Sequence, residues 1–362
     1  ISRKLADPLA VLIQSSSSAG KTTLMDGILS LVPPEDRQKW TSMTAQALYY
    51  VDEERLKHKL LAVAEEEGAE KATYPLKILQ SEKELRIATT IKDPKSGEFK
   101  VQEKIVEGPT ALLLTTTAAE VDEELLNRFI RLTVNEDRAQ SESIHQRQRL
   151  AKTLEGLKSK VKAEGVRQKH HHAQRLLKPL QVLNPFADQL TFMSDYLRSR
   201  RDQPKYLGLI EAVTFLHQYQ RPQNLIEIEG KQVACVEVTL KDIEIANALI
   251  HEVLGRCLDE LAPQTRRLLN LVYKMVQESC EKSSLDQEEI FFTRRQIREY
   301  TRFGDTQLKM HLKRLEDLEY LLVHQGKRGQ SFVYALLWRG EGEDRLPFLL
   351  GLIDPKKLKL PS

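Results

Sequence analysis

The stretch that decides the fold reads AVLIQSSSSAGKTTLMDGILSL and covers residues 10–31. Ala10–Gln14 is an apolar run that predicts a strand, Ser15–Gly20 predicts a loop, and Lys21–Leu31 predicts a helix. A strand, a short loop that ends in Gly-Lys-Thr and a helix, in this order, are typical of a phosphate-binding P-loop, whose backbone N–H groups surround phosphates. The sequence therefore predicts a nucleoside triphosphate as the ligand.

Each residue type in the predicted loop has a chemical reason to be there. Gly20 lets the backbone approach the phosphates, Lys21 brings an ammonium group to the β- and γ-phosphates, and Thr22 offers a hydroxyl to Mg²⁺. Ser15 replaces the usual first glycine of the motif, and we expect this to affect turnover more than nucleotide binding. We therefore predict ATP and Mg²⁺ as cofactors, bound by Ser16, Ser17, Ser18, Ala19, Gly20, Lys21, Thr22 and Thr23.

A second apolar run, Leu60–Ala64, ends in three glutamates. A P-loop ATPase needs acids at the end of a neighbouring strand, where they hold Mg²⁺ and polarise the attacking water. This pattern assigns Glu65 to the Mg²⁺ shell, together with Thr22, and Glu66 to the water. The alternative is an amphipathic helix over residues 56–67 that ends in solvated acids.

Composition and charge exclude several classes of protein. With 41% hydrophobic and 30% charged residues, the chain has the balance of a soluble folded protein, and no apolar run approaches the ~18–20 residues of a membrane span. Three scattered cysteines suit a reducing compartment, so we expect a cytoplasmic protein without a membrane partner. The net charge of only +3 means that any nucleic-acid surface must be local. The first residue is Ile1 rather than Met, which is typical of a chain excised from a longer protein.

The segments after residue 84 follow an order that resembles a known family. Leu85–Ile91 and Phe99–Ile105 flank a Pro/Gly turn and predict a β-hairpin, and the apolar run Ala111–Leu114 predicts the next strand. Asn127-Arg128-Phe129 comes after that strand. This order resembles the AAA+ ATPases that carry a hairpin before the sensor-1 strand, especially the minichromosome-maintenance helicases, whose arginine-finger motif S-R-F is similar to N-R-F.

The resemblance continues through the helical part of the chain. Arg201, before a helix expected over Tyr206–Gln220, looks like the sensor-2 arginine of the AAA+ lid, although Arg198 and Arg200 compete for the role. The whole chain is similar to the helicase-like portion of zinc-finger primase proteins of bacterial mobile elements and phages. This resemblance implies an α/β AAA+ core over residues 1–140, a helical connection and lid over 141–255, a winged helix over 256–340 and a C-terminal tail over 341–362.

This resemblance also implies roles for single residues. Arg128 would reach the site of a neighbouring subunit in a ring, which the family implies to be a hexamer, and Thr117 would be the sensor-1 residue. The alternative for Arg128 is an ordinary surface ion pair. Lys92, Lys95 and Lys100 at the hairpin tip would contact single-stranded DNA in the pore.

The C-terminal region has the pattern of a helix–turn–helix followed by a basic hairpin. Thr293 and Asp305 are predicted N-caps of two helices, and the second helix has a buried stripe at Leu308, Leu312 and Leu315. Residues 291–337 hold nine Lys/Arg and five Asp/Glu, an excess that favours nucleic acid. In a winged helix, duplex DNA would contact Lys309 and Lys313 on the helix and Lys327 and Arg328 on the wing.

We therefore predict an ATP-dependent DNA helicase or translocase that acts in replication of a mobile element or phage, with a primase domain or partner. One alternative is an ATP-gated initiator that binds DNA and loads other factors without unwinding. The other is an AAA+ protein remodeller, against which the lysine-rich hairpin argues, since such machines usually carry an aromatic–hydrophobic pore loop.

Overall fold

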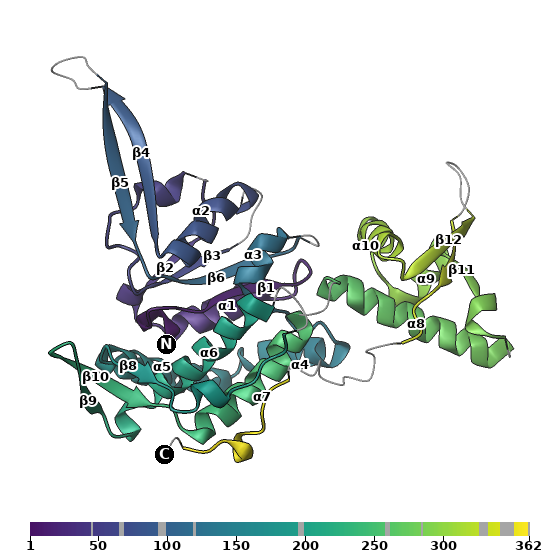
Figure 1. The fold of residues 1–362 in the computed structure, drawn as a ribbon. Helices are drawn as coiled ribbons and strands as arrows, with labels where there is room; N and C mark the ends of the chain where they lie inside the picture. Colours follow the sequence, from purple (N-terminus) through teal and green to yellow (C-terminus); the bar gives the residue numbers. More distant parts are fainter. Residues whose placement is uncertain are drawn as a thin grey trace. The chain divides into compact units, whose positions relative to one another are not determined.

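A computed structural model describes the chain in two units (Figure 1). The first unit comprises residues 1–117, 121–257 and 349–362, and the second comprises 118–120 and 258–348. Within the described ranges, no helix combines the length and the apolar character needed to cross a membrane. The structure describes all residues except 45, 65–68, 93–98, 119–120, 195–198, 258–260, 284, 326–331, 341–350 and 361–362.

The centre of the first unit is a five-stranded sheet in which all neighbouring strands are parallel. A parallel sheet is covered on both faces, so its strands are near-continuous apolar runs, as in the LLAV and ALLL segments of two of them. The expected α/β class with a parallel sheet is confirmed. In spatial order the strands are β2 (Arg37–Trp40), β3 (Leu60–Val63), β6 (Ala111–Thr116), β1 (Ala10–Gln14) and β7 (Ile130–Leu132).

Alternate side chains of the central strands pack against helices on opposite faces of the sheet. Ile13, Ala62 and Leu113 pack with residues of α1 (Lys21–Ser30). Their neighbours along the strands, which include Leu12, pack on the other face with α2 and α3. Residues 60–63 therefore form the expected strand rather than a helix. The two helices of the second face are α2 (Ala69–Glu82) and α3 (Glu123–Arg128).

The predicted hairpin before β6 is present and is long. β4 (Glu84–Lys92) pairs with β5 (Phe99–Glu107) in antiparallel register from Glu84 opposite Glu107 to Lys92 opposite Phe99. Its base is fixed because Leu85 and Val106 are buried in the core next to α2. From this base the hairpin projects away from the central sheet (Figure 1).

The rest of the first unit is mainly helical and carries a small sheet of order β8-β10-β9. α6 begins at Ser199, seven residues before the expected Tyr206, and it contains Pro204. The elements are α4 (Arg138–Leu150), α5 (Leu154–Leu176), α6 (Ser199–Leu216), α7 (Leu240–Cys257), β8 (Gln181–Leu183), β9 (Asn224–Ile228) and β10 (Lys231–Glu237). Short 3₁₀ turns cover Ser2–Lys4, Pro34–Asp36, Ala47–Tyr50, Ala187–Gln189, Gln218–Gln220 and Pro355–Lys357.

The C-terminal half of α5 is anchored to the segment that follows α1. Gln174 donates to the carbonyl of Leu31 (2.7 Å) and accepts from the guanidinium of Arg3 (2.8 Å), which is 2% exposed. Arg175 forms an ion pair with Glu35 (2.6 Å). These contacts fix one face of α5 against the sheet domain and leave the opposite face to solvent.

The second unit is built from three helices and a three-stranded antiparallel sheet of order β11-β13-β12. Leu308, Leu312 and Leu315 are 0–2% exposed, so the predicted stripe is buried. In chain order the elements are α8 (Pro263–Ser283), a 3₁₀ turn (Gln287–Glu289), β11 (Phe291–Thr293), α9 (Arg294–Thr301), α10 (Asp305–Asp317), β12 (Leu321–Gln325) and β13 (Val333–Leu336).

One of the two predicted helix caps is correct. Thr293 caps α9 through a reciprocal capping box with Gln296. The expectation that Asp305 caps α10 is wrong, since Gly304 is the N-cap and Asp305 is the first helical residue. The Asp305 carboxylate instead pairs with Lys309 one turn further on (2.7 Å).

A histidine lies inside the core of the second unit. His311 is 2% exposed, shares a 2.9 Å hydrogen bond with the hydroxyl of Thr265 and meets the ring of Phe303 edge-on. Burial lowers the pKa of His311, because the charged imidazolium loses its hydration. The side chain is therefore held neutral in the folded unit.

We expect the second unit to lose stability as the pH falls below about 6.5, the ordinary histidine value. Below that pH the unfolded chain binds a proton that folded His311 does not bind, so stability falls by at most about 1.4 kcal/mol per pH unit. The measurement is urea unfolding followed by the fluorescence of buried Trp338 in a Trp40→Phe background. His311→Gln should remove this pH dependence and His324→Gln, at an exposed position, should keep it; the reverse result would contradict the assignment.

Candidate functional site

The predicted P-loop lies at the carboxyl edge of the parallel sheet, where ligands bind in open α/β folds. β1 lies between β6 and β7, with Gln14 opposite Thr116. Ser15 continues this pairing by donating its N–H to the carbonyl of Thr116 (3.2 Å). The loop is therefore fixed beside the end of β6, where the predicted sensor Thr117 follows and is exposed.

The loop curls around the side chain of Lys21. Lys21 is 8% exposed, and its ammonium group donates to the carbonyls of Ser15 (2.9 Å) and Ser16 (2.8 Å). Gly20 has φ +92° and is the N-cap of α1, a conformation that disfavours any other residue. Ser18 also lies in the left-handed region, at φ 64°. The Lys21 cation is thus buried against loop carbonyls at the first residue of α1.

These residues fit a polyphosphate and its magnesium ion. No side chain caps the N-terminus of α1, and no atom lies within 4 Å of the position that a Cβ on Gly20 would take, so the backbone is open to a ligand. Thr22 and Thr23 are exposed in the first turn of α1, and Ser17 is exposed in the loop, with Ser16 and Ala19 half-buried. Lys21 would hold the phosphates and the hydroxyl of Thr22 would meet Mg²⁺.

The serines of the loop are hydrogen-bonded to the segment after β7. The hydroxyl of Ser15 accepts from the N–H of Val134 (2.7 Å). The carboxylate of Glu136 accepts from the N–H of Ser16 (2.8 Å) and from its hydroxyl (2.9 Å). Ser15 is therefore a structural partner rather than a defect in the motif. Sequence reasoning missed Glu136, although an acid just after a strand that neighbours β1 is a signal for it.

The two predicted catalytic acids, Glu65 and Glu66, lie outside the residues that the structure describes. β3 ends at Val63, and β3 and β1 are both hydrogen-bonded to β6. Because all three strands are parallel, the chain leaves β3 at the same edge of the sheet as the P-loop.

Arg128 is bound within its own unit. Its Nη2 atom pairs with Glu124 (2.7 Å) and its Nη1 atom donates to the carbonyl of Lys77 (3.2 Å). Lys77 pairs with the same carboxylate (2.7 Å), and Lys77 and Arg128 together lower the pKa of Glu124 to about 2. The Arg128 side chain is 15% exposed, so it lies at the surface of α3 with one edge toward α2.

The helix α6 joins the same segment through a buried ion pair that the sequence did not reveal. Asp202 (0% exposed) accepts from Lys205 (2.8 Å), and Lys205 also donates to the carbonyl of Phe129 (3.1 Å). The predicted sensor Arg201 is exposed, as is Arg200, whereas Arg198 lies outside the described residues. The charged residues that α6 buries are therefore not the arginines that sequence reasoning selected.

The predicted DNA-binding residues fall into two groups. Lys95, Lys327 and Arg328 lie outside the described residues, and the backbone of Lys92 and Lys100 lies at the ends of β4 and β5, with side chains that the structure leaves out. Lys309 and Lys313 are exposed on α10 and pair with acids one turn away, Asp305 (2.7 Å) and Asp317 (2.8 Å). Exposed pairs of this kind are weak and exchange readily for other anions.

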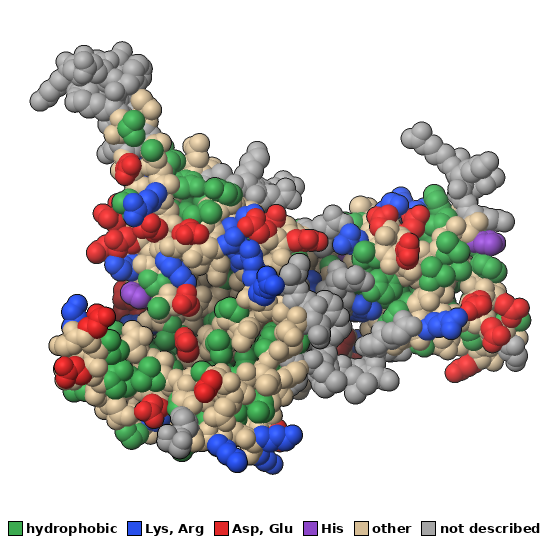
Figure 2. Space-filling view, viewed as in Figure 1, with side chains coloured by type: hydrophobic (Ala, Val, Ile, Leu, Met, Phe, Trp, Pro, Cys, Tyr) green, Lys and Arg blue, Asp and Glu red, His purple; other side chains and the backbone are tan. Residues whose placement is uncertain are grey.

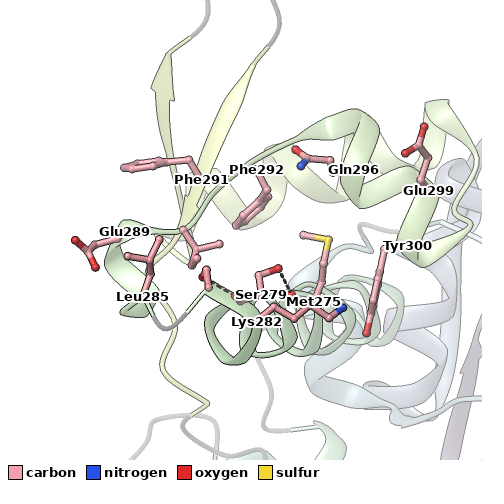
Figure 3. Close-up of a pocket in the computed structure, with 12 residues that line it drawn as sticks. Met275, Ser279, Lys282, Leu285, Glu289, Phe291, Phe292, Gln296, Glu299 and Tyr300 are labelled. Atoms are coloured by element: carbon pink, nitrogen blue, oxygen red, sulfur yellow. Dashed lines mark hydrogen bonds between the residues drawn. The ribbon is translucent and has the colours of Figure 1, made fainter.

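A separate groove of about 680 Å³ lies in the second unit between α8, β11 and α9 (Figure 3). Met275 and Phe292 lie at its centre, and charged residues such as Glu299 lie at its rim. Ser279 and Ser283 donate their hydroxyls to carbonyls of their own helix (2.8 and 2.7 Å), and the lining mixes apolar with polar and charged side chains. No residue of the sequence-predicted site lines it.

The three adjacent histidines of α5 are separated by the helix. The ring of His171 is hydrogen-bonded to the carbonyl of Ser30 (2.8 Å), and His170 and His172 are exposed on other faces. Among the residues that the structure describes, no group of three or more His, Cys, Asp or Glu could hold a metal ion.

Comparison of the chain with protein-family models finds no match, and comparison with curated proteins finds no similar sequence. The geometry of the loop and the sheet therefore carries the functional argument.

Two glycine substitutions in the loop should have opposite effects on stability. Ser15→Gly restores the usual motif but removes the acceptor of the Val134 N–H and frees the backbone, which we expect to cost about 1–2 kcal/mol. Ser18→Gly relieves a left-handed serine and should leave stability unchanged or slightly raised. Urea unfolding followed by far-UV circular dichroism measures both. If Ser15→Gly proved as stable as the parent chain, the role of this hydroxyl would be disproved.

Proposed function

We propose that this chain is an AAA+ ATPase with a helical lid and a winged helix, and that it uses ATP to move along DNA and unwind it during replication of a mobile element or phage. The observation that carries the proposal is the loop Ser15–Thr22, which encloses the ammonium of Lys21 at the carboxyl edge of a parallel sheet. A buried cation at the uncapped N-terminus of a helix is suited to phosphates.

The order of strands supports hydrolysis as well as binding. β6, which ends in threonines, is adjacent to β1, and β3, followed by Glu65 and Glu66, is the next strand. In the proposed site Lys21 binds the phosphates, Glu65 and Thr22 hold the ion, and Glu66 takes a proton from the attacking water. A bound Mg²⁺ would neutralise the charge that develops on the transferred phosphoryl group.

The second unit supports the proposal of a winged helix. A helix, a short strand, two helices joined by a tight turn and a β-hairpin follow one another, and the three strands form one antiparallel sheet. In this arrangement α10 would enter the major groove and the β12–β13 hairpin would be the wing. Lys309 and Lys313 lie on the exposed face of α10, opposite its buried leucines.

The hairpin β4–β5 supports the proposed motor. It is nine residue pairs long and is rooted in the core beside α2, and the sequence places Lys95 in the connection between its strands, with Lys92 and Lys100 at the strand ends. In a ring, several such tips would lie around one strand of DNA and bind its phosphates. Movement of the core during hydrolysis would then move the tips.

The proposed function predicts ATP hydrolysis that single-stranded DNA stimulates, and strand separation of a forked DNA. Lys21→Ala should lower hydrolysis about a hundredfold or more, because it removes a charge that the transition state needs. Lys95→Ala should lower unwinding while leaving DNA-free hydrolysis unchanged. Phosphate release and a forked-duplex assay measure the two activities.

Two outcomes of that assay would favour other functions. ATP-dependent binding of duplex DNA without unwinding would support the initiator. If Lys21→Ala and Lys95→Ala both left unwinding intact, the motor assignment would be lost.

A ring with shared sites makes a further prediction about Arg128. Arg128→Ala alone should lower hydrolysis by about 10³–10⁵-fold if its guanidinium leaves Glu124 to reach the next subunit's phosphate. An equal mixture of Arg128→Ala and Lys21→Ala chains should regain about a quarter of the parent activity, because one interface in four joins two intact halves. The chain with both changes, mixed with Lys21→Ala, is the inactive control. A mixture that stays inactive would mean that Arg128 serves only its own unit.

A further inference from the structure

The helical arm of α4 and α5, residues 138–176, is the most unevenly charged part of the chain. It holds ten Lys or Arg and three Asp or Glu, an excess of seven, whereas the whole chain has a net charge of +3. The remainder of the chain is therefore net negative. On the face shown in Figure 2, acidic and basic side chains lie intermixed over the first unit, as this near-neutral balance implies.

The arm is also unusually open to solvent. α4 buries none of its residues, and in the first four turns of α5 only Gly156 is buried, against the backbone of Leu150 and Ala151. The contacts that anchor α5, through His171, Gln174 and Arg175, all belong to its last two turns. The basic residues before them stand on a helix without packing partners in the described part of the unit.

Three lysines of α5 form one continuous stripe. Lys158, Lys162 and Lys169 follow a spacing of i, i+4 and i+11, which places them on one face of a helix over about 16 Å. All three are exposed, and they lie on the side opposite to the anchoring Gln174. Gly165 lies between them on the same face, with nothing within 4 Å of its Cβ position, so a ligand can approach the helix backbone there.

These three lysines form no ion pair with an acid among the described residues. Three other lysines proposed to bind a ligand do have partners. Lys309 and Lys313 each pair with acids on α10, and Lys21 is hydrogen-bonded to loop carbonyls. α5 itself has two acids: Glu164 is engaged by Arg167 on another face, and Glu155, one turn before Lys158, forms no ion pair with it. The stripe therefore presents three lysines without an ion-pair partner to solvent.

The chemistry of the stripe fits a polyanion with regularly spaced phosphates. An ammonium binds phosphate as a point charge, and release of counterions from nucleic acid makes such contacts favourable without sequence preference. A membrane surface fits less well. The exposed apolar residues of α5 beside the stripe, Leu154, Leu157, Val161 and Val166, are all aliphatic, and neither α4 nor α5 contains a Phe, Tyr or Trp to anchor in a lipid interface.

We propose that the Lys158–Lys162–Lys169 stripe is a nucleic-acid site that binds the phosphodiester backbone, separate from the β4–β5 hairpin and from the second unit. It rests on the proposed function only for the choice of DNA as the nucleic acid. The arm begins directly after Glu136 and Asp137, and Glu136 is hydrogen-bonded to the P-loop. The site therefore lies on a helical arm whose preceding residues are hydrogen-bonded to the nucleotide loop.

The test is the affinity of the full chain for a labelled single-stranded oligonucleotide, measured by fluorescence anisotropy without nucleotide. The triple variant Lys158→Gln/Lys162→Gln/Lys169→Gln should bind about tenfold more weakly at about 100 mM salt, and the slope of log K against log salt should fall by about 2. The matched control is Lys356→Gln/Lys357→Gln/Lys359→Gln, which removes three exposed lysines elsewhere in the first unit and should keep both values. The triple Lys→Arg variant of the stripe should also keep the affinity.

Three results would overturn the proposal: no loss of affinity in the stripe variant, an equal loss in the control, or a loss of binding to phosphatidylserine vesicles with DNA binding unchanged. The binding assay contains no ATP, so it measures the contribution of the stripe to DNA affinity even if the chain does not hydrolyse ATP. ATP hydrolysis without DNA should be the same in the stripe variant and the parent chain. If neither chain hydrolyses ATP, the ATPase proposal fails, while the DNA-binding result still tests the stripe.

Discussion

The position of β1 between β6 and β7 is the constraint on which the candidate site depends. Because β1 pairs in parallel with both neighbours, its carboxyl end lies at the same edge of the sheet as the carboxyl ends of β6 and β7. Ser15 is thereby fixed to Thr116 on one side and to Val134 on the other. With the loop fixed at both sides, its carbonyls converge on the ammonium of Lys21.

The same loop is joined to parts of the chain that are far away in sequence. Glu136 connects Ser16 to the segment that leads into α4, so a rearrangement of the loop on binding phosphate would act on the start of the helical arm. A second link runs from α6 to the end of α3, through the buried pair of Asp202 and Lys205 and the carbonyl of Phe129. A buried pair is costly to break, because removing one partner leaves a charge without compensation. α6 and the end of α3 are therefore expected to move together.

The small net charge of the chain hides an uneven distribution, because the excess of basic residues lies on the arm formed by α4 and α5. Most exposed lysines and arginines outside the arm discussed above are interspersed with acids, as on α10, and the net charge of the chain is small. An exposed pair adds little to stability, yet it reduces the local field that an approaching polyanion experiences. An uncompensated lysine stripe on a helix with few packing contacts is thus more informative about a partner than the number of basic residues in the whole chain.

The sequence by itself determined the local elements, because each depends on neighbours along the chain. The strand, loop and helix of residues 10–30, the hairpin and the buried stripe of α10 follow from apolar periodicity and from the positions of glycine. Only the tertiary structure decided what depends on distant partners. It gave Ser15 a hydrogen bond to Val134, brought Glu136 to the loop, and placed Arg128 against the carbonyl of Lys77. The hydrogen bonds to the loop join residues about 120 positions apart, and periodicity carries no information about which distant side chains will meet.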